Sequence, residues 1–165
     1  MIRINMFSQA DTVQGQGVGS AYKELVRLLR TRLVDDFYVT INKYGASDLT
    51  HYHTINPTYF ANSFLPSRGR KIGYVHFLPE TLEGSVKLPE PAKSIFYKYV
   101  IDFYKRMDQI VVVNPIFIDK LVKYGISEEK VKYIPNFVAK SEFYEQTQVQ
   151  KNKAATVPGG VLEAR

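Results

Sequence analysis

The chain has 165 residues, a net charge of +6 at pH 7 and no cysteine, so it has room for one domain, and disulfide scaffolds and thiolate metal sites are excluded. Its hydrophobic fraction of 45% and charged fraction of 23% exclude a wholly disordered chain. No apolar stretch approaches the about 20 residues that span a bilayer, and the start, MIRINMFSQA, lacks the pattern of a signal peptide. We therefore expect a cytoplasmic protein whose basic excess favours an anionic partner.

Short β-like runs alternate with segments of helical period along the chain. Strands are predicted over residues 2–7, 37–41, 48–55, 71–77, 109–113 and 131–134. Helices are predicted over residues 21–33 with Ser20 as N-cap, over 89–107 with Pro91 in the first turn, and over 116–124 with Gly125 as the stop. This alternation predicts an α/β fold, an open, doubly wound, mostly parallel sheet of Rossmann-like type.

In such a sheet, ligands bind beyond the carboxyl ends of the strands. The segments expected to converge there are the glycine loop after the first strand, residues 52–56, residues 76–81, Asn114 and Asn136. The polar segment from residue 146 onward lacks periodicity and indicates a linker or a tail, one that could be foreign to the natural protein.

The glycine loop runs from Gly15 to Ser20 and opens the first predicted helix. It is not a dinucleotide fingerprint, because Ser20 stands where a third glycine is needed, and it is not a P-loop, because no Gly-Lys-Ser/Thr follows. Free N–H groups at a helix start favour contact with an anion or a sugar. The alternative is a loop whose glycines only allow the chain to turn.

All three histidines fall in strand-end segments. His51 and His53 share one face if their segment is extended, and His76 follows the fourth predicted strand. A three-histidine zinc site is one interpretation, and hydrogen bonding to neighbouring loops is the other. His76 and Glu80 together could orient or deprotonate a substrate hydroxyl, whereas the plainer alternative is a surface loop with one titratable group.

Residues 65–106 carry eight basic and four acidic side chains. Aromatic rings lie among them in the second predicted helix, which favours contact with an anionic membrane surface. The candidate contact residues are Arg68, Arg70, Lys71, Lys93, Lys98, Lys105 and Arg106. A core helix with a solvated face explains the same pattern more simply. No motif that reads RNA or DNA occurs, so nucleic acid is not an expected partner.

Five motifs follow one another between residues 2 and 145: INMFSQADTVQGQGVGSAYKEL, DLTHYHTINPTYF, KIGYVHFLPETLEGS, FYKRMDQIVVVNP and GISEEKVKYIPNFV. In order and spacing they resemble the N-terminal half of a GT-B-fold retaining glycosyltransferase of family 4. The chain is particularly similar to bacterial enzymes that add a hexose to a glucosyl-diacylglycerol. Two positions depart from the broad family and are tolerated in this subgroup: Phe137 replaces a glycine, and Asn114 stands where many relatives have serine.

The resemblance implies a role for particular positions. His76 matches the catalytic histidine that lies near the transferred sugar. The remaining matches are Gly17, Val18 and Gly19 in the loop that approaches the donor phosphates and the acceptor, and His53, Glu80, Thr81 and Asn136 on the acceptor side. No metal and no cofactor is implied, because retaining GT-B enzymes generally transfer the sugar without a divalent ion.

The resemblance also implies a function for the whole protein. A hexose would pass from a nucleotide sugar (UDP-sugar) to a membrane glycolipid at the inner face of the cell membrane. Residues 1–145 match only the acceptor-side domain and residues 146–165 would be the linker or tail, so the C-terminal donor-binding domain is absent and we expect the isolated chain to be inactive. The alternatives are a non-catalytic module that docks on a membrane or a partner, and one subunit of a two-chain glycosyltransferase.

Overall fold

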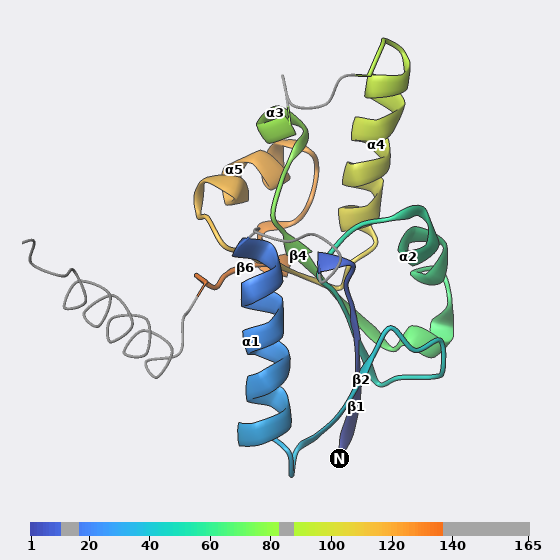
Figure 1. The fold of residues 1–165 in the computed structure, drawn as a ribbon. Coiled ribbons are helices and arrows are strands. Elements are labelled where there is room, and N and C mark those ends of the chain that lie inside the picture. Colours follow the sequence, from blue (N-terminus) through green and yellow to red (C-terminus); the bar gives the residue numbers. More distant parts are fainter. Residues whose placement is uncertain (11–16, 83–87, 137–165) are drawn as a thin grey trace, which may run out of the picture.

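Six parallel strands form one sheet in the order β2-β1-β3-β4-β5-β6 (Figure 1). The computed structural model describes residues 1–10, 17–82 and 88–136. The strands are β1 (Ile2–Phe7), β2 (Phe37–Ile41), β3 (Leu49–Tyr52), β4 (Arg70–Val75), β5 (Gln109–Val112) and β6 (Val131–Tyr133). The predicted Rossmann-like parallel sheet is confirmed. The predicted tail over residues 146–165 lies outside the described residues.

The strand order places a topological switch point between β1 and β3. The chain adds β2 on one side of β1 and then adds β3 to β6 on the other side. In open parallel sheets of this kind, the connections leave a crevice at the carboxyl edge where the order reverses. The segments that follow β1 and β3 therefore border the position where a ligand is expected.

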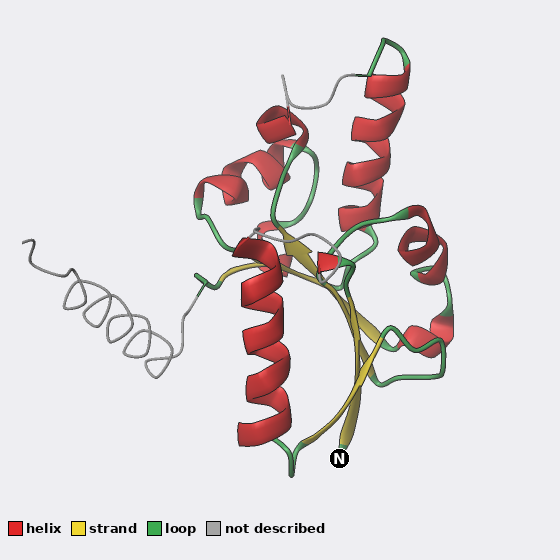
Figure 2. Ribbon diagram, in the orientation of Figure 1, coloured by secondary structure: helices red, strands yellow, loops and turns green. Residues whose placement is uncertain are grey.

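Helices flank both faces of the sheet (Figure 2). They are α1 (Gly17–Arg32), α2 (Pro57–Asn62), α3 (Pro79–Leu82), α4 (Ala92–Lys105) and α5 (Ile116–Lys123), with 3-10 turns at Pro66–Arg68 and Glu128–Lys130. Gly125 ends α5 with a φ of 82°, as predicted. Pro91 precedes α4 as its N-cap and does not lie in its first turn. The sequence analysis did not predict α2 or α3, because six and four residues are too few to show a helical period.

Helix α1 begins four residues earlier than the apolar pattern predicts. A Cβ atom on Gly19 would lie 3.0 Å from the carbonyl oxygen of Ala10, so the absence of a side chain lets the helix start pack against the segment that leaves β1. Ser20 lies inside the helix, and its prediction as the N-cap is wrong. Gly17 and Gly19 belong to the first turn of α1 and not to a loop before it.

The two faces of the sheet have separate apolar cores. On one face, Ile4 and Met6 pack with Tyr22 and Val26 of α1. On the other face, a larger cluster gathers residues of β1, β3, β4 and β5 with residues of α2, α4 and α5. Figure 1 shows α1 and α2 on opposite sides of the sheet. The alternation of side chains along β1 serves both cores, because successive residues of a strand point to opposite faces.

Arg68 anchors the segment that crosses from β2 to β3. Its guanidinium donates hydrogen bonds to the backbone carbonyls of Lys43 (3.4 Å), Tyr44 and Gly45 (2.7 Å). The side chain is buried, with only 2% of its surface exposed, and its guanidinium carbon lies 5.9 Å from the centre of the Phe7 ring. The prediction that Arg68 contacts a membrane is therefore wrong, because its charge is used inside the fold.

Candidate functional site

The carboxyl edge of the sheet brings His53 and His76 together. His53 follows β3 and His76 follows β4, and these strands are neighbours in parallel register. The Nε2 atoms of the two rings lie 3.1 Å apart, and the ring centroids lie 4.5 Å apart. The two imidazoles thus form a hydrogen-bonded pair, which we call the histidine pair. The two histidines meet because each directly follows one of two adjacent parallel strands. The sequence predicts that the ends of the strands converge at one edge.

Aromatic rings enclose the histidine pair. The ring centroid of His53 lies 5.1 Å from that of Tyr22 on α1 and 4.9 Å from that of Tyr74 on β4. His51 lies next to the pair, with its centroid 5.7 Å from that of His53. His51 and His53 are both buried. The pair is therefore shielded from water on the side of the sheet that α1 covers.

This burial keeps His51 and His76 neutral near pH 7. Burial, together with the nearby imidazole of His53, lowers the pKa of His76 to about 3. Burial and the imidazoles of His53 and His76 lower the pKa of His51 to about 3 as well. Near pH 7 one Nε2 of the pair must carry the proton and donate it to the other, because two neutral imidazoles cannot both donate at the same contact. His76 can therefore orient a hydroxyl group but does not supply a positive charge.

Two of the imidazole nitrogens that a metal would need are already used in the contact between His53 and His76. Among residues 1–10, 17–82 and 88–136, no group of three or more histidine or carboxylate side chains is placed to hold a metal ion. His53 and His76 hydrogen-bond to each other, which differs from the predicted hydrogen bonds to neighbouring loops.

Asn42 fixes the first residue after β1, and the sequence analysis missed it. Its Oδ1 accepts a hydrogen bond from the Ser8 amide (3.0 Å), and its Nδ2 donates to the Ser8 carbonyl (3.0 Å). Its backbone has a φ of 50°, a left-handed conformation that asparagine tolerates better than most residues. The next amide, of Gln9, donates to Thr54 Oγ1 (2.9 Å). The polar side chains that follow β2 and β3 thus hold the beginning of the β1–α1 connection in place.

The glycine segment opens α1 at the same edge. Gly17, Val18 and Gly19 form the first turn of the helix, and Tyr22, one turn later, contacts His53. Gly15 and Gln16 lie outside the described residues. The amino end of α1 is therefore close to the histidine pair, and the first backbone amides of a helix have no partner within the helix itself.

Glu80 and Thr81 follow the histidine pair on the short helix α3. Glu80 Oε1 accepts a hydrogen bond from the Tyr124 hydroxyl at the end of α5 (2.8 Å), and burial together with Glu80 raises the pKa of Tyr124 to about 12. The Thr81 hydroxyl donates to the Leu78 carbonyl (2.8 Å) and accepts from the Leu78 amide (2.9 Å). Both side chains thus stabilise the segment after β4 in the described structure.

Asn136 lies farther along the sheet. It is exposed and follows β6, which is separated from β4 by β5. The structure therefore brings His53 and His76 into contact and places Glu80 and Thr81 a few residues beyond them, while Asn136 marks the far end of the same edge.

The other predicted membrane contacts are dispersed over the surface. Arg70 and Lys71 begin β4, at the edge opposite to the histidine pair, and Lys71 lies 3.7 Å from Asp108. Lys105 is exposed at the end of α4. None of the helices in the described part of the chain combines the length and the apolar character that crossing a bilayer requires.

Three more of these basic side chains have local partners on or next to α4. Lys93 lies over the Tyr97 ring, 5.5 Å from its centre, and Lys98 pairs with Asp102 at 2.5 Å. Arg106 lies 3.3 Å from the centre of the Phe64 ring and donates to the Ser63 hydroxyl. An ion pair at an exposed position contributes little to stability, so Lys98 remains available to an anionic surface.

A family model and a curated relative match most of the chain. The model for Glycosyltransferase Family 4 matches residues 16–142. The chain is 54% identical over 144 residues to a protein of Streptococcus pneumoniae (strain ATCC BAA-255 / R6) named alpha-galactosylglucosyldiacylglycerol synthase. The alignment covers 87% of this chain and 38% of that relative, so the chain spans well under half of the relative's length.

Solved structures with a similar fold also match most of the chain. Two crystal structures of Anabaena Alr3699/HepE, one with UDP and glucose and one with UDP-glucose, superimpose with TM-scores of 0.56 and 0.57. Each is 12% identical to this chain, covers 92% of it and is matched over 50% of its own length. This likeness concerns the fold, and it confirms the expected half of a GT-B architecture.

Proposed function

The chain belongs to glycosyltransferase family 4, and on this premise we propose that it forms the acceptor-binding half of a retaining hexosyltransferase. The enzyme would move a hexose from a UDP-sugar to a membrane glycolipid such as glucosyl-diacylglycerol. The observation that carries the proposal is the 54% identity to a protein named as a glycosyldiacylglycerol synthase. We assign residues 1–145 to the acceptor-side domain and residues 146–165 to a linker.

In this proposal the histidine pair positions the sugar. The contact between His53 and His76 fixes both rings, so that His76 can present its second ring nitrogen to a sugar hydroxyl. His76 acts as a neutral hydrogen-bonding group, because its pKa is lowered to about 3. Holding a hydroxyl in line with the bond that forms is one of the larger contributions that an enzyme makes to transfer.

The amino end of α1 would contact the other substrate, the nucleotide sugar. Diphosphate charge grows as the nucleotide leaves, and backbone amides at a helix start stabilise such charge. Gly17 and Gly19 allow a phosphate to approach the backbone closely. Most contacts to the UDP-sugar would come from a second domain of the complete enzyme. Glu80, Thr81 and Asn136 would border the acceptor along the same edge.

The membrane is the third partner. A glycolipid acceptor requires access to the bilayer, and basic side chains are attracted to anionic lipid headgroups. Of the six exposed or half-buried candidates, Lys93 and Lys98 on α4 are the proposed contacts at the inner face of the cell membrane. Arg70 and Lys71 lie at the edge opposite to the histidine pair and would not face the same membrane, and Lys105 and Arg106 lie at the far end of α4. A protein bound in this way is a peripheral membrane protein. We propose no nucleic acid partner for it.

Titration calorimetry with a soluble acceptor tests this function. We expect the 165-residue chain to bind glucosyl-dioctanoylglycerol, to bind a UDP-hexose far more weakly and to transfer no sugar. His76→Gln should weaken acceptor binding about tenfold, while Lys123→Gln, an exposed change at the end of α5, should leave it unchanged. Sugar transfer by the chain alone, or donor binding without acceptor binding, would contradict the proposal.

A further inference from the structure

An apolar groove runs between α2 and α4. It has a volume of about 600 Å³, and we call it the α2–α4 groove. Its lining residues are Ile55, Asn56, Pro57, Phe60, Ala92, Ile95, Phe96 and Tyr99. Ile95 leaves 67% of its surface exposed to water at this groove. Covering apolar surface of this kind is favourable by about 25 cal/mol per Å², so the groove suits a ligand that is largely hydrocarbon.

The groove also contains two hydrogen-bond donors that are not used. Asn56 Oδ1 accepts from the Tyr59 amide and caps α2 (2.8 Å), while its Nδ2 is buried without a partner within the described residues. The Tyr99 hydroxyl is also buried and finds no acceptor in that part of the chain. A buried polar group without a partner is costly, and such groups are rare in folded proteins.

These two donors indicate which chemical groups a ligand of the groove should have. Both the amide nitrogen of Asn56 and the protonated hydroxyl of Tyr99 need an acceptor oxygen. Burial raises the pKa of Tyr99 to about 12, so this hydroxyl keeps its proton near pH 7. A ligand that fits must combine apolar chains with carbonyl oxygens. It should carry no charge in the groove, because a charge against the apolar wall would lose its water without gaining a partner.

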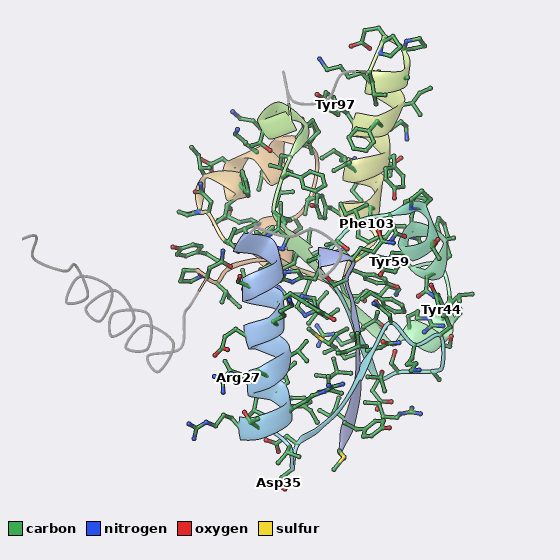
Figure 3. The ribbon with its side chains drawn as sticks, in the orientation of Figure 1. Arg27, Asp35, Tyr44, Tyr59, Tyr97 and Phe103 are labelled. Atoms are coloured by element: carbon green, nitrogen blue, oxygen red, sulfur yellow. The ribbon has the colours of Figure 1, made fainter. Side chains whose placement is uncertain are left out.

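The groove begins a few residues after His53 of the histidine pair along the chain. Ile55 and Asn56 follow His53 by two and three residues, at the carboxyl edge of the sheet. Figure 3 shows Tyr59 and Phe103 near each other, where α2 and the lower end of α4 meet, and Tyr97 higher on α4. A molecule with its sugar at the histidine pair would have to extend around the carboxyl edge of the sheet, from the side that α1 covers to the side that α2 and α4 cover, to place its apolar chain in the groove.

We infer that the α2–α4 groove binds the ester-linked acyl chain of a diacylglycerol glycolipid, with Asn56 Nδ2 and the Tyr99 hydroxyl donating to an ester carbonyl. This inference rests on the proposed function and adds a lipid subsite to it. It makes the acceptor site sensitive to the linkage of the lipid. A dialkyl ether lipid has the same apolar chains but no carbonyl oxygen, so it leaves both donors without a partner.

Three variants separate this subsite from a role in folding. Tyr99→Phe removes the hydroxyl and keeps the ring. Asn56→Asp keeps the oxygen that caps α2 but replaces the donor by an acceptor. Tyr97→Phe is the matched control, because Tyr97 is on the same helix, also has a buried hydroxyl without a partner among the described residues, and lines a different groove with Pro79 and Tyr124.

The test is calorimetric binding of glucosyl-dioctanoylglycerol and of its dioctyl diether analogue to the 165-residue chain. The unmodified chain should prefer the ester by about 3- to 10-fold. Tyr99→Phe should remove most of this preference by weakening ester binding, while ether binding and the melting temperature stay the same or rise. Asn56→Asp should weaken ester binding more than ether binding, because its carboxylate repels the ester carbonyl and must also be desolvated. Tyr97→Phe should behave like the unmodified chain.

Two results would overturn the inference and have different consequences. Equal binding of ester and ether by the unmodified chain, or equal losses in Tyr97→Phe and Tyr99→Phe, would remove the subsite and leave acceptor binding intact. A chain that binds neither lipid would remove the subsite together with the proposed acceptor function.

Discussion

Arg68→Met is expected to destabilise the fold by about 3–5 kcal/mol. Methionine fills a similar volume but donates no hydrogen bond, so the carbonyls of Lys43, Tyr44 and Gly45 lose the guanidinium that binds them. The crossing segment between β2 and β3 also loses its attachment to the 3-10 turn at Pro66–Arg68. Urea unfolding followed by circular dichroism measures the effect as a change in the free energy of unfolding.

Arg70→Met is the control for this variant. Arg70 is only two residues away and is exposed at the start of β4, so its replacement should change stability by no more than about 0.5 kcal/mol. Arg68→Lys should lose most of the stability that Arg68→Met loses, because one ammonium group cannot match the fork of a guanidinium. Small and equal losses in Arg68→Met and Arg70→Met would show that Arg68 is not the buried anchor described above.

Lowering the pH from about 7 to about 5 is expected to reduce the free energy of unfolding by about 3–4 kcal/mol. His51 and His76 stay neutral in the folded chain until the pH approaches about 3, whereas histidines in the unfolded chain bind protons near pH 6.5. The unfolded state therefore holds more protons throughout this interval. Stability is present in full above pH 6.5 and falls as the pH decreases toward 3.

Substitutions assign this effect to the two rings. His51→Gln and His76→Gln each remove one titrating group, so each should remove about half of the slope of stability against pH. Asp48, whose pKa is lowered to about 2 by its hydrogen bonds to Arg3, loses its stabilising charge only below the interval. Urea unfolding at several pH values provides the measurement, and a stability that does not change between pH 7 and 5 would contradict the buried, neutral site.

The arrangement of the strands and the meeting of two histidines could be predicted from the sequence. Alternating strands and helices require parallel strands with their carboxyl ends at one edge, so residues that directly follow neighbouring strands lie close together. His53 and His76 are such residues, and they are in contact. The prediction needed only the positions where the strands end, whereas the order of the strands within the sheet comes from the structure.

Arg68 and Asn42 show where such prediction stops. Both side chains bind backbone groups, Arg68 the carbonyls of the crossing segment and Asn42 the amide and carbonyl of Ser8. Backbone groups are the same at every residue, so no side-chain pattern marks these contacts in advance. The charge of Arg68 suggested a position at the surface. Its backbone partners can be identified only once the path of the chain from β2 to β3 is known.

The central claim is that the carboxyl edge around the histidine pair binds a glycolipid sugar. Nuclear magnetic resonance tests it most directly, through a titration of the isotope-labelled chain with glucosyl-dioctanoylglycerol. The account predicts that the largest shifts occur at the imidazole nitrogens of His53 and His76 and at the amides of Ser8 and Gly19. Shifts confined to the opposite edge, around Arg70 and Asp108, would contradict it.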